Sequence, residues 1–298
     1  MAAKEDSFSP FDDVLLDVDV SQPWAHDQGD SPVYEPSYDT LNKILAVAVE
    51  RGSVRQSGIF ANGIDVWIAH ELRRAGFSAD EVWPRPTRPR ILPRELAMLL
   101  ESLPPKLRDD LAPRIAGMPA IAPVDAKVLG RAYEKQVDVA IARWDRGPEV
   151  LISTKAQLSS FGKNLPNRFE ESYGDAGNLR GRYPLAAVGY FFVQRATITR
   201  DEPAAFERTI DMVRKLRAAG DVNGYSATAL LLVDWTTDEE GAIRTSVIED
   251  VVPDDIAAPQ FFTTMIDTVL AASPVTYHVA VREARERRVL PLPENPDS

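Results

Sequence analysis

The chain has 298 residues, of which 44% are hydrophobic and 27% are charged, which suits one large soluble domain or two ordinary ones. The absence of cysteine excludes disulfides, zinc fingers, iron–sulfur clusters and thiol nucleophiles, and the three histidines stand far apart in the sequence. No apolar run approaches the roughly 20 residues that cross a bilayer, and the N-terminus lacks the apolar stretch of a secretory signal. We therefore expect a cytoplasmic protein that does not associate with a membrane.

The negative charge is concentrated at the N-terminus. Of the formal net charge of -11, residues 1–40 contribute -9 and the other 258 residues only -2. We expect residues 1–37 to be an acidic, flexible leader, and the alternative is an arm that packs on a partner or mimics nucleic acid. A globally basic nucleic-acid binder is excluded, whereas a near-neutral body with a local basic groove is not.

Residues 38–118 are expected to form a helical N-terminal domain. Apolar residues recur at helical spacing on both sides of a Gly/Ser-rich break at 52–63, and further helical patterns cover about 94–103 and 106–115. Between these helices, residues 83–94 carry four arginines among four prolines, which favour an extended path. This strap is either a stiff surface linker or a segment that contacts phosphate, because arginine forks suit phosphate; its arginines are Arg85, Arg88, Arg90 and Arg94.

Residues 119–290 are expected to form an α/β domain with a mixed sheet flanked by helices, before a short tail at 291–298. A helix at about 123–135 should lead into strands at 137–144 and 149–157, which turn residues connect at 145–148. The later patterns predict strands at 185–194, 227–235 and 243–249, and helices at about 168–180, 202–219, 255–272 and 275–287.

The first two strands of this domain carry the candidate chemistry. A short turn makes them antiparallel neighbours, so Asp138 on the first strand and Lys155 on the second lie at the same end of the hairpin. Ser153, Lys155 and Gln157 share one face of the second strand because side chains alternate. Carboxylate and carbonyl oxygens suit Mg²⁺, and a lysine beside the metal can orient water and offset charge on a phosphate.

This arrangement resembles the PD-(D/E)XK nuclease superfamily, whose core is a helix, a hairpin with an Asp and a (D/E)xK element, a second helix and another strand. The resemblance covers about 122–195 and implies that Glu134 is the acid of the preceding helix, Asp138 the strand acid and Lys155 the lysine. It also implies Mg²⁺, with Mn²⁺ as a substitute, held by Asp138 and Glu134, with the Thr154 carbonyl as a further candidate ligand. Gln157 matches a glutamine that follows the lysine in several branches of that family.

One position departs from the family pattern. The second acid should stand two residues before the lysine, where this chain has Ser153, a neutral and weaker ligand. Either Glu134 or Glu149 could supply the missing carboxylate, and Glu134 is preferred. If neither does, the site belongs to a degenerate relative that only binds.

The segment after the hairpin is rich in polar and basic residues. Residues 153–182 sum to +2 in a body that sums to -2. Asparagine and arginine can contact phosphates and base edges. The candidate substrate-binding residues are Lys163, Asn164, Asn167 and Arg168, and the alternative is an ordinary solvated helix with Asn167 as its cap and Glu170 completing a capping box.

The preferred function is a Mg²⁺-dependent DNA endonuclease of restriction or phage-defence type, expected to be a homodimer because duplex cleavage usually needs two sites. The main alternative is a catalytically degenerate nuclease-fold subunit that binds DNA or protein partners in a larger complex. A more distant alternative is a small-molecule enzyme on an unrelated α/β scaffold, for which the sequence indicates no residues.

Overall fold

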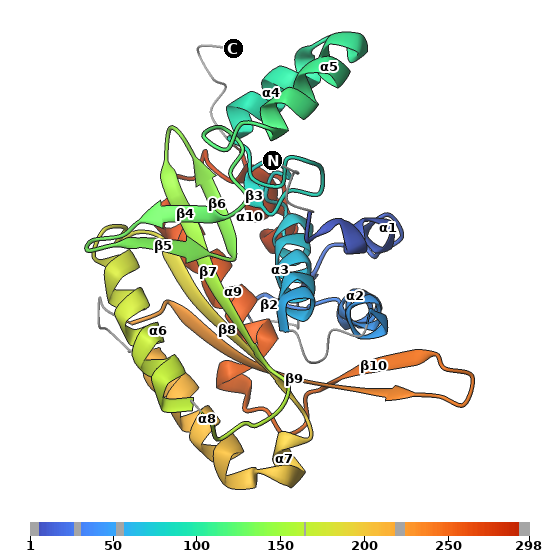
Figure 1. Cartoon of the computed structure of the whole chain (residues 1–298). Helices are drawn as coiled ribbons and strands as arrows, with labels where there is room; N and C mark the ends of the chain where they lie inside the picture. The colour runs from blue at the N-terminus through green and yellow to red at the C-terminus, as the bar shows by residue number, and fades with distance from the viewer. Residues whose placement is uncertain (1–5, 27–30, 52–56, 164, 218–223, 292–298) are drawn as a thin grey trace.

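The computed structural model describes residues 6–26, 31–51, 57–163, 165–217 and 224–291 (Figure 1). Within this part of the chain, six strands form one mixed sheet in the order β10-β9-β8-β7-β6-β3. The three middle strands run parallel and the outer ones antiparallel to their neighbours. The strands are β3 (Val82–Trp83), β6 (Val139–Arg143), β7 (Gly147–Gln157), β8 (Ala187–Arg195), β9 (Ala227–Thr237) and β10 (Ile243–Ile248). The predicted α/β class with a mixed sheet is confirmed.

Helices cover both faces of the sheet (Figure 1). One face packs on α2 (Tyr38–Glu50), α3 (Ser57–Arg74) and α9 (Ala258–Ala272), and the other packs on α6 (Leu165–Arg180) and α8 (Pro203–Leu216). Strand β7 illustrates the division, because Ile152 joins the first buried cluster and Leu151 the second. This alternation follows from the period of two of a strand with both faces covered.

Smaller elements complete the described fold. Helices α4 (Arg94–Ser102) and α5 (Pro105–Ala116) pack on each other around a small apolar cluster of their own and project from the body (Figure 1). A two-stranded sheet of β4 (Ala126–Leu129) and β5 (Glu134–Val137) precedes β6. The remaining elements are η1 (Ser9–Phe11), α1 (Asp12–Leu15), β1 (Trp24–Ala25), β2 (Val33–Tyr34), α7 (Ile198–Asp201), η3 (Asp254–Ile256) and α10 (Val279–Glu286).

The N-terminal segment does not behave as the flexible leader that its acidity predicts. Its described residues place the fully buried aromatic rings of Phe11, Trp24 and Tyr34 in the same cluster as the sheet. The Tyr34 hydroxyl donates to the backbone carbonyl of Glu71, 2.7 Å away, within α3. Burial of three aromatic side chains outweighs the solvation of the acidic residues between them, because each ring removes a large apolar area from water.

A separate helical N-terminal domain is not confirmed either. Helices α2 and α3 contribute to the buried cluster that packs on the sheet, and β3 pairs with β6 inside the sheet. The expected tail at 291–298 lies outside the described residues except for its first position. In the described part of the chain no helix has the length and apolar character needed to span a membrane.

Candidate functional site

The β6–β7 hairpin places Asp138 and Lys155 at one end of the sheet, as predicted. Strand β6 begins at Val139, which is opposite Ile152, and the Asp138 amide donates to the Ile152 carbonyl at 3.0 Å. Two residues further along β7, the Thr154 amide donates to Asp138 Oδ2 at 2.8 Å. The Asp138 side chain thus takes the place that a strand carbonyl would occupy if the ladder continued.

A second carboxylate reaches the same threonine from α3. The Thr154 hydroxyl donates to Asp65 Oδ1 at 2.5 Å, and both side chains are buried. Thr154 therefore binds Asp138 through its backbone and Asp65 through its side chain. Sequence analysis did not select Asp65. In the structure, residues 63–72 of α3 are all buried. A carboxylate in such a buried helix requires a partner, and this requirement is the signal that points to Asp65.

Burial and mutual repulsion oppose the ionisation of this pair. Burial raises the pKa of Asp65 well above its ordinary value, the Asp138 charge raises it further, and the Thr154 hydrogen bond and Lys155 act in the opposite direction. Burial also raises the pKa of Asp138, against the effects of Lys155 and the Thr154 amide. Two close carboxylates that resist joint ionisation take up either a proton or a cation. Such perturbed groups mark candidate functional sites.

A pocket opens beside the two carboxylates. Its volume is about 90 Å³, enough for a small ion or a few water molecules. Asp65 and Asp138 line it together with Asn62 of α3 and with Ser7 and Phe8 of the N-terminal segment. Lys155 is half-buried, and its charge favours ionisation of both carboxylates.

Glu134 does not occupy the place that the resemblance implies. The predicted helix at 123–135 is instead the β4–β5 hairpin, where Glu134 is exposed and pairs with Leu129. The residues that line the pocket beside Asp65 and Asp138 do not include Glu134. Contacts with α6 explain the hairpin, because Asn178 Oδ1 on α6 accepts hydrogen bonds from the amides of Ala132 and Tyr133 at the turn of the hairpin.

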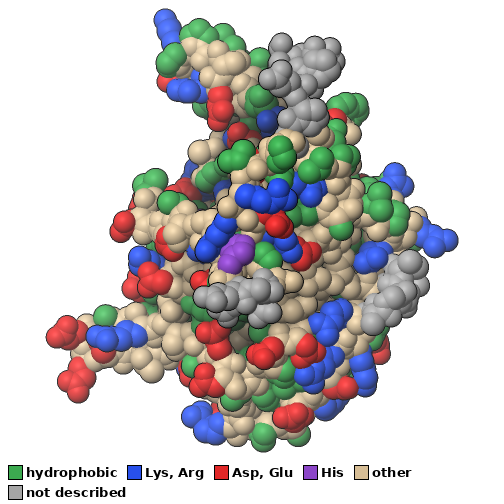
Figure 2. Space-filling model, turned by 180° about the vertical axis from the view of Figure 1, so that it is seen from behind, with side chains coloured by type: hydrophobic (Ala, Val, Ile, Leu, Met, Phe, Trp, Pro, Cys, Tyr) green, Lys and Arg blue, Asp and Glu red, His purple; other side chains and the backbone are tan. Residues whose placement is uncertain are grey.

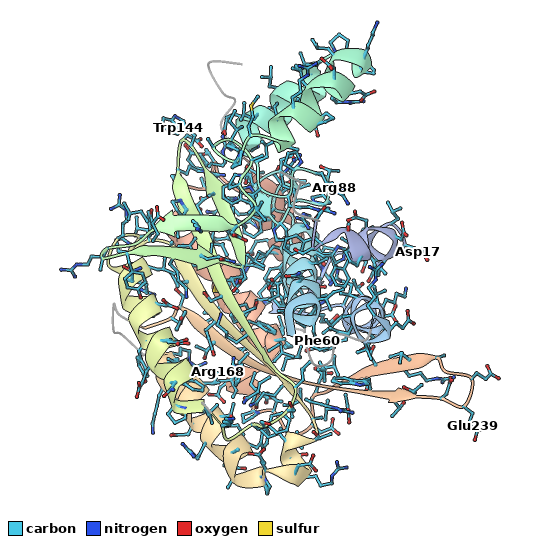
Figure 3. The ribbon with its side chains drawn as sticks, in the orientation of Figure 1. Asp17, Phe60, Arg88, Trp144, Arg168 and Glu239 are labelled. Carbon is cyan, nitrogen blue, oxygen red and sulfur yellow. The ribbon has the colours of Figure 1, made fainter. Side chains whose placement is uncertain are left out.

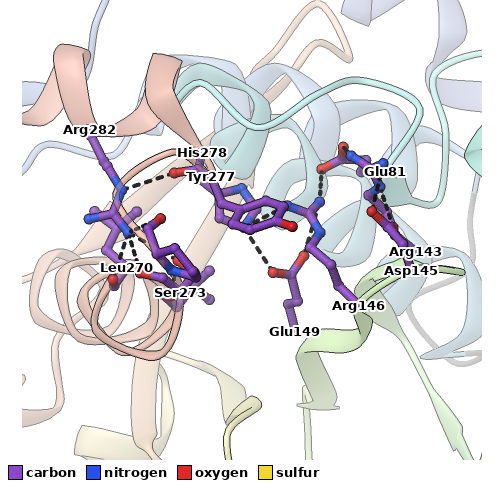
Figure 4. Close-up of polar contacts among 12 residues, drawn as sticks. Glu81, Arg143, Asp145, Arg146, Glu149, Leu270, Ser273, Tyr277, His278 and Arg282 are labelled. Carbon is purple, nitrogen blue, oxygen red and sulfur yellow. Dashed lines mark hydrogen bonds and ion pairs between the residues drawn. The ribbon is translucent and has the colours of Figure 1, made fainter. Parts of the chain in front are cut away.

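Glu149, the other possible source of a second carboxylate, is at the far end of β7. It belongs to a polar cluster that joins the β6–β7 turn to the segment before α10 (Figure 4). Glu149 Oε1 lies 2.9 Å from His278 Nε2. Arg146 Nη2 lies 3.2 Å from Glu81 Oε2 and 3.2 Å from Glu149 Oε2. The Arg146–Glu149 ion pair and the Glu149–His278 hydrogen bond give Glu149 and His278 a structural role.

Ser153 and Gln157 are buried on β7, on the strand face predicted for them. Gln157 Nε2 donates to the carbonyls of Ser160 and Phe161 at 3.0 Å, and Gln157 Oε1 accepts from Gln194 Nε2 at 3.0 Å. Gln157 therefore fixes the loop that leaves β7. That role accounts for a buried glutamine at this position without a direct part in chemistry.

The predicted substrate-binding residues lie on the segment after β7. Lys163 and Asn167 are exposed, Arg168 is half-buried, and Asn164 lies outside the described residues. Asn167 is the third residue of α6 and so is not its N-cap. Figure 3 shows Arg168 on α6, which packs on the face of the sheet opposite α3, the helix that carries Phe60 and Asp65.

A larger pocket of about 410 Å³ lies between α9 and α10, with Asp267, Arg282 and Arg285 in its lining. Arg285 pairs with Asp267 at 2.7 Å, and Arg282 donates to carbonyls at the end of α9. These three charged groups are thus used within the fold, and the candidate site remains the carboxylate pair. Comparison of the chain with protein-family models, with curated proteins and with solved structures finds no match.

Proposed function

We propose that this chain is a metal-dependent endonuclease of PD-(D/E)XK type that hydrolyses phosphodiester bonds in DNA. The observation that carries the proposal is the convergence of Asp65 and Asp138 on Thr154, directly before Lys155. The order α3, β6, β7, α6, β8 is consistent with it, because it is the helix, hairpin, helix and strand order of that family, although β3, α4, α5, β4 and β5 are inserted between α3 and β6. In this reading Asp65 takes the role that sequence analysis gave to Glu134.

The donor set suits a hard divalent cation. Asp65 and Asp138 would hold Mg²⁺, or Mn²⁺ in its place, since carboxylate oxygens are its preferred ligands. The Thr154 carbonyl leaves β7 on the same edge as the Thr154 amide, so it is a third candidate oxygen. Bound there, the cation would supply Lewis-acid stabilisation of charge on the phosphate.

The chain's own residues would do the rest. The Thr154 hydroxyl and amide orient the two carboxylates, which fixes the position of the charge before substrate arrives. The Lys155 ammonium would donate hydrogen bonds to the attacking water and to a phosphate oxygen, which stabilises negative charge as the bond to the leaving oxygen breaks. Cleavage of both strands requires two such sites, so a homodimer is part of the proposal.

The test is cleavage of supercoiled and linear DNA in Mg²⁺ and in Mn²⁺. Wild type should cleave, Asp138→Asn and Lys155→Met should lose at least about a hundredfold in rate, and Glu134→Gln should cleave like wild type. The Glu134→Gln control removes a nearby negative charge without touching the pocket. Full activity in Lys155→Met would contradict the assigned mechanism.

A second candidate is a degenerate relative that binds DNA or a protein partner without cleavage. Ser153 at the position of the second family acid favours it, because a neutral hydroxyl holds a metal less strongly than a carboxylate. Such a protein would show no DNA cleavage in either metal and no more Mg²⁺ or Mn²⁺ binding than its Asp138→Ala variant.

A further inference from the structure

The arginine-rich strap at 83–94 is part of the folded core. Arg85 and Arg90 are buried, and each donates to backbone carbonyls of the strap, so the segment forms a tight loop after β3. The Arg88 side chain is 59% exposed. The strap therefore presents a fixed guanidinium, that of Arg90, beside an accessible one.

An acidic side chain of the N-terminal segment bridges these two arginines. Asp6 Oδ2 lies 2.7 Å from Arg88 Nε and 2.9 Å from Arg90 Nε. Both oxygens of Asp12 lie 2.7 Å from a terminal nitrogen of Arg90. A carboxylate oxygen shared by two guanidinium groups occupies the kind of site that a phosphate oxygen prefers, since both anions accept charge-assisted hydrogen bonds from arginine.

The charge balance of the strap depends on that segment. Arg73 of α3 lies close enough to Arg85 and Arg90 that burial, together with their charges, lowers the pKa of Arg73 to about 9. Among the described residues, the ion pairs of these arginines are with Asp80, on the segment before β3, and with Asp6 and Asp12. Without the last two carboxylates the strap would carry a concentrated positive charge.

The same N-terminal segment continues to the candidate site. Ser7 and Phe8, which follow Asp6, line the pocket that contains Asp65 and Asp138. The Ser7 carbonyl accepts from Asn62 Nδ2 at 3.4 Å, one turn of α3 before Asp65. A single short stretch, residues 6–8, therefore contacts both the arginines and the pocket that contains the carboxylates.

We propose that Arg88 and Arg90 form a binding site for a backbone phosphate of DNA, which the Asp6 carboxylate occupies in the unliganded protein and which DNA must take over. The inference rests on the proposed function and adds to it a substrate contact on the α3 side of the sheet. Exchange of one anion for another leaves the arginines paired throughout, so displacement of Asp6 costs less than exposure of buried unpaired guanidinium groups would.

The test is the equilibrium binding of a fluorescent DNA duplex to the full chain in EDTA, measured by anisotropy at several salt concentrations. Asp6→Asn keeps the Oδ1 atom that accepts the Phe8 amide but removes the competing charge. It should bind DNA about fivefold more tightly than wild type, because one more phosphate contact is available without competition. Asp17→Asn is the matched control, since Asp17 is an exposed acid just after α1 (Figure 3), and it should change affinity less than twofold.

Arg88→Ala in the Asp6→Asn background should return the affinity to the wild-type level or below. If Asp6→Asn unfolds, Asp12→Asn releases the other carboxylate from Arg90 and takes its place in the test. Equal affinity of Asp6→Asn and Asp17→Asn, or no DNA binding by any variant, would overturn the proposal. If the protein cleaves DNA in Mg²⁺ but Asp6→Asn does not change the DNA affinity, the nuclease function is supported and the phosphate site is not. If the predicted affinity changes occur without cleavage, they support the phosphate site and count against the nuclease function.

Discussion

Thr154 is the residue on which the candidate site depends. Its amide and its hydroxyl bind carboxylates from two elements that are far apart in the sequence. Lys155 follows Thr154 directly in the sequence, and its positive charge acts to lower the pKa of both carboxylates. A site built on the end of a central strand is held rigidly, which is what the positioning of a metal and a phosphate requires.

Replacement of Asp65 by Asn should raise stability while it reduces cleavage by at least about a hundredfold. The amide oxygen can still accept from Thr154, but the buried negative charge is gone. Because burial raises the pKa of Asp65, the folded chain keeps a proton that the unfolded chain releases above its ordinary value of about 3.8, so wild type loses stability as the pH rises through this window. Without metal, the melting temperature of Asp65→Asn should exceed that of wild type at pH 8, by a margin that shrinks towards pH 4.

Glu134→Gln provides the control for this measurement, since it removes an exposed carboxylate and should leave the melting temperature unchanged across the same range. A difference between Asp65→Asn and wild type that does not vary with pH would show that ionisation of Asp65 is not the cause.

The placement of Asp138 and Lys155 at one end of the hairpin could be predicted from the sequence, whereas the contact of Asp65 with Thr154 could not. The first two belong to one hairpin, whose turn chemistry and alternation are local signals. Asp65 reaches Thr154 only through the packing of α3 on the sheet, a contact between residues 89 positions apart. The family pattern directed attention to the nearest preceding acid, Glu134, whereas the acid that the fold brings to the site lies much further back in the chain.

Among the elements, the β6–β7 hairpin was predicted correctly and the β4–β5 hairpin was not. Gly147, the first residue of β7 after the β6–β7 turn, has φ +73°, a conformation that glycine adopts without strain. The β4–β5 turn gave no such signal, because its stability comes from Asn178 on α6. Gly130 is required there, since a Cβ at this position would overlap the Asn178 amide group.

The loop after β7 supplies a prediction at this scale. Gln157→Leu leaves the Ser160 and Phe161 carbonyls without their donor, which should cost about 1–3 kcal/mol in the free energy of unfolding. Hydrogen exchange of amides in the loop should become faster. Ser159→Ala, an exposed change in the same loop, is the control and should have no measurable effect. Unchanged stability and exchange in Gln157→Leu would refute its structural role.

For the whole molecule, the N-terminal segment is part of the fold and also covers the candidate site. Its acidity predicted a flexible leader, but its few aromatic residues anchor it to the body. Phe11 is buried and packs directly against Gly63 of α3, which has no side chain to keep the ring away. Basic and acidic side chains are interspersed over the face of the molecule shown in Figure 2, as the near-neutral charge of the body leads one to expect.

Two substitutions in that segment test its contribution to the core. Phe11→Ala should lower the free energy of unfolding by about 3–5 kcal/mol, measured by denaturant titration, because it leaves a cavity against α3. Leu16 is 86% exposed, and Leu16→Ala should change stability by less than about 0.5 kcal/mol. Similar small effects of both substitutions would mean that the segment is detached from the body in solution.

The central claim is that Asp65 and Asp138 together hold a divalent cation. Titration with Mn²⁺, followed by the electron paramagnetic resonance signal of the free ion, measures this cation binding most directly. Wild type and Glu134→Gln should bind Mn²⁺ with equal affinity, and the Asp65→Asn/Asp138→Asn double variant should bind at least about tenfold more weakly. Equal binding by the double variant and wild type would contradict the claim.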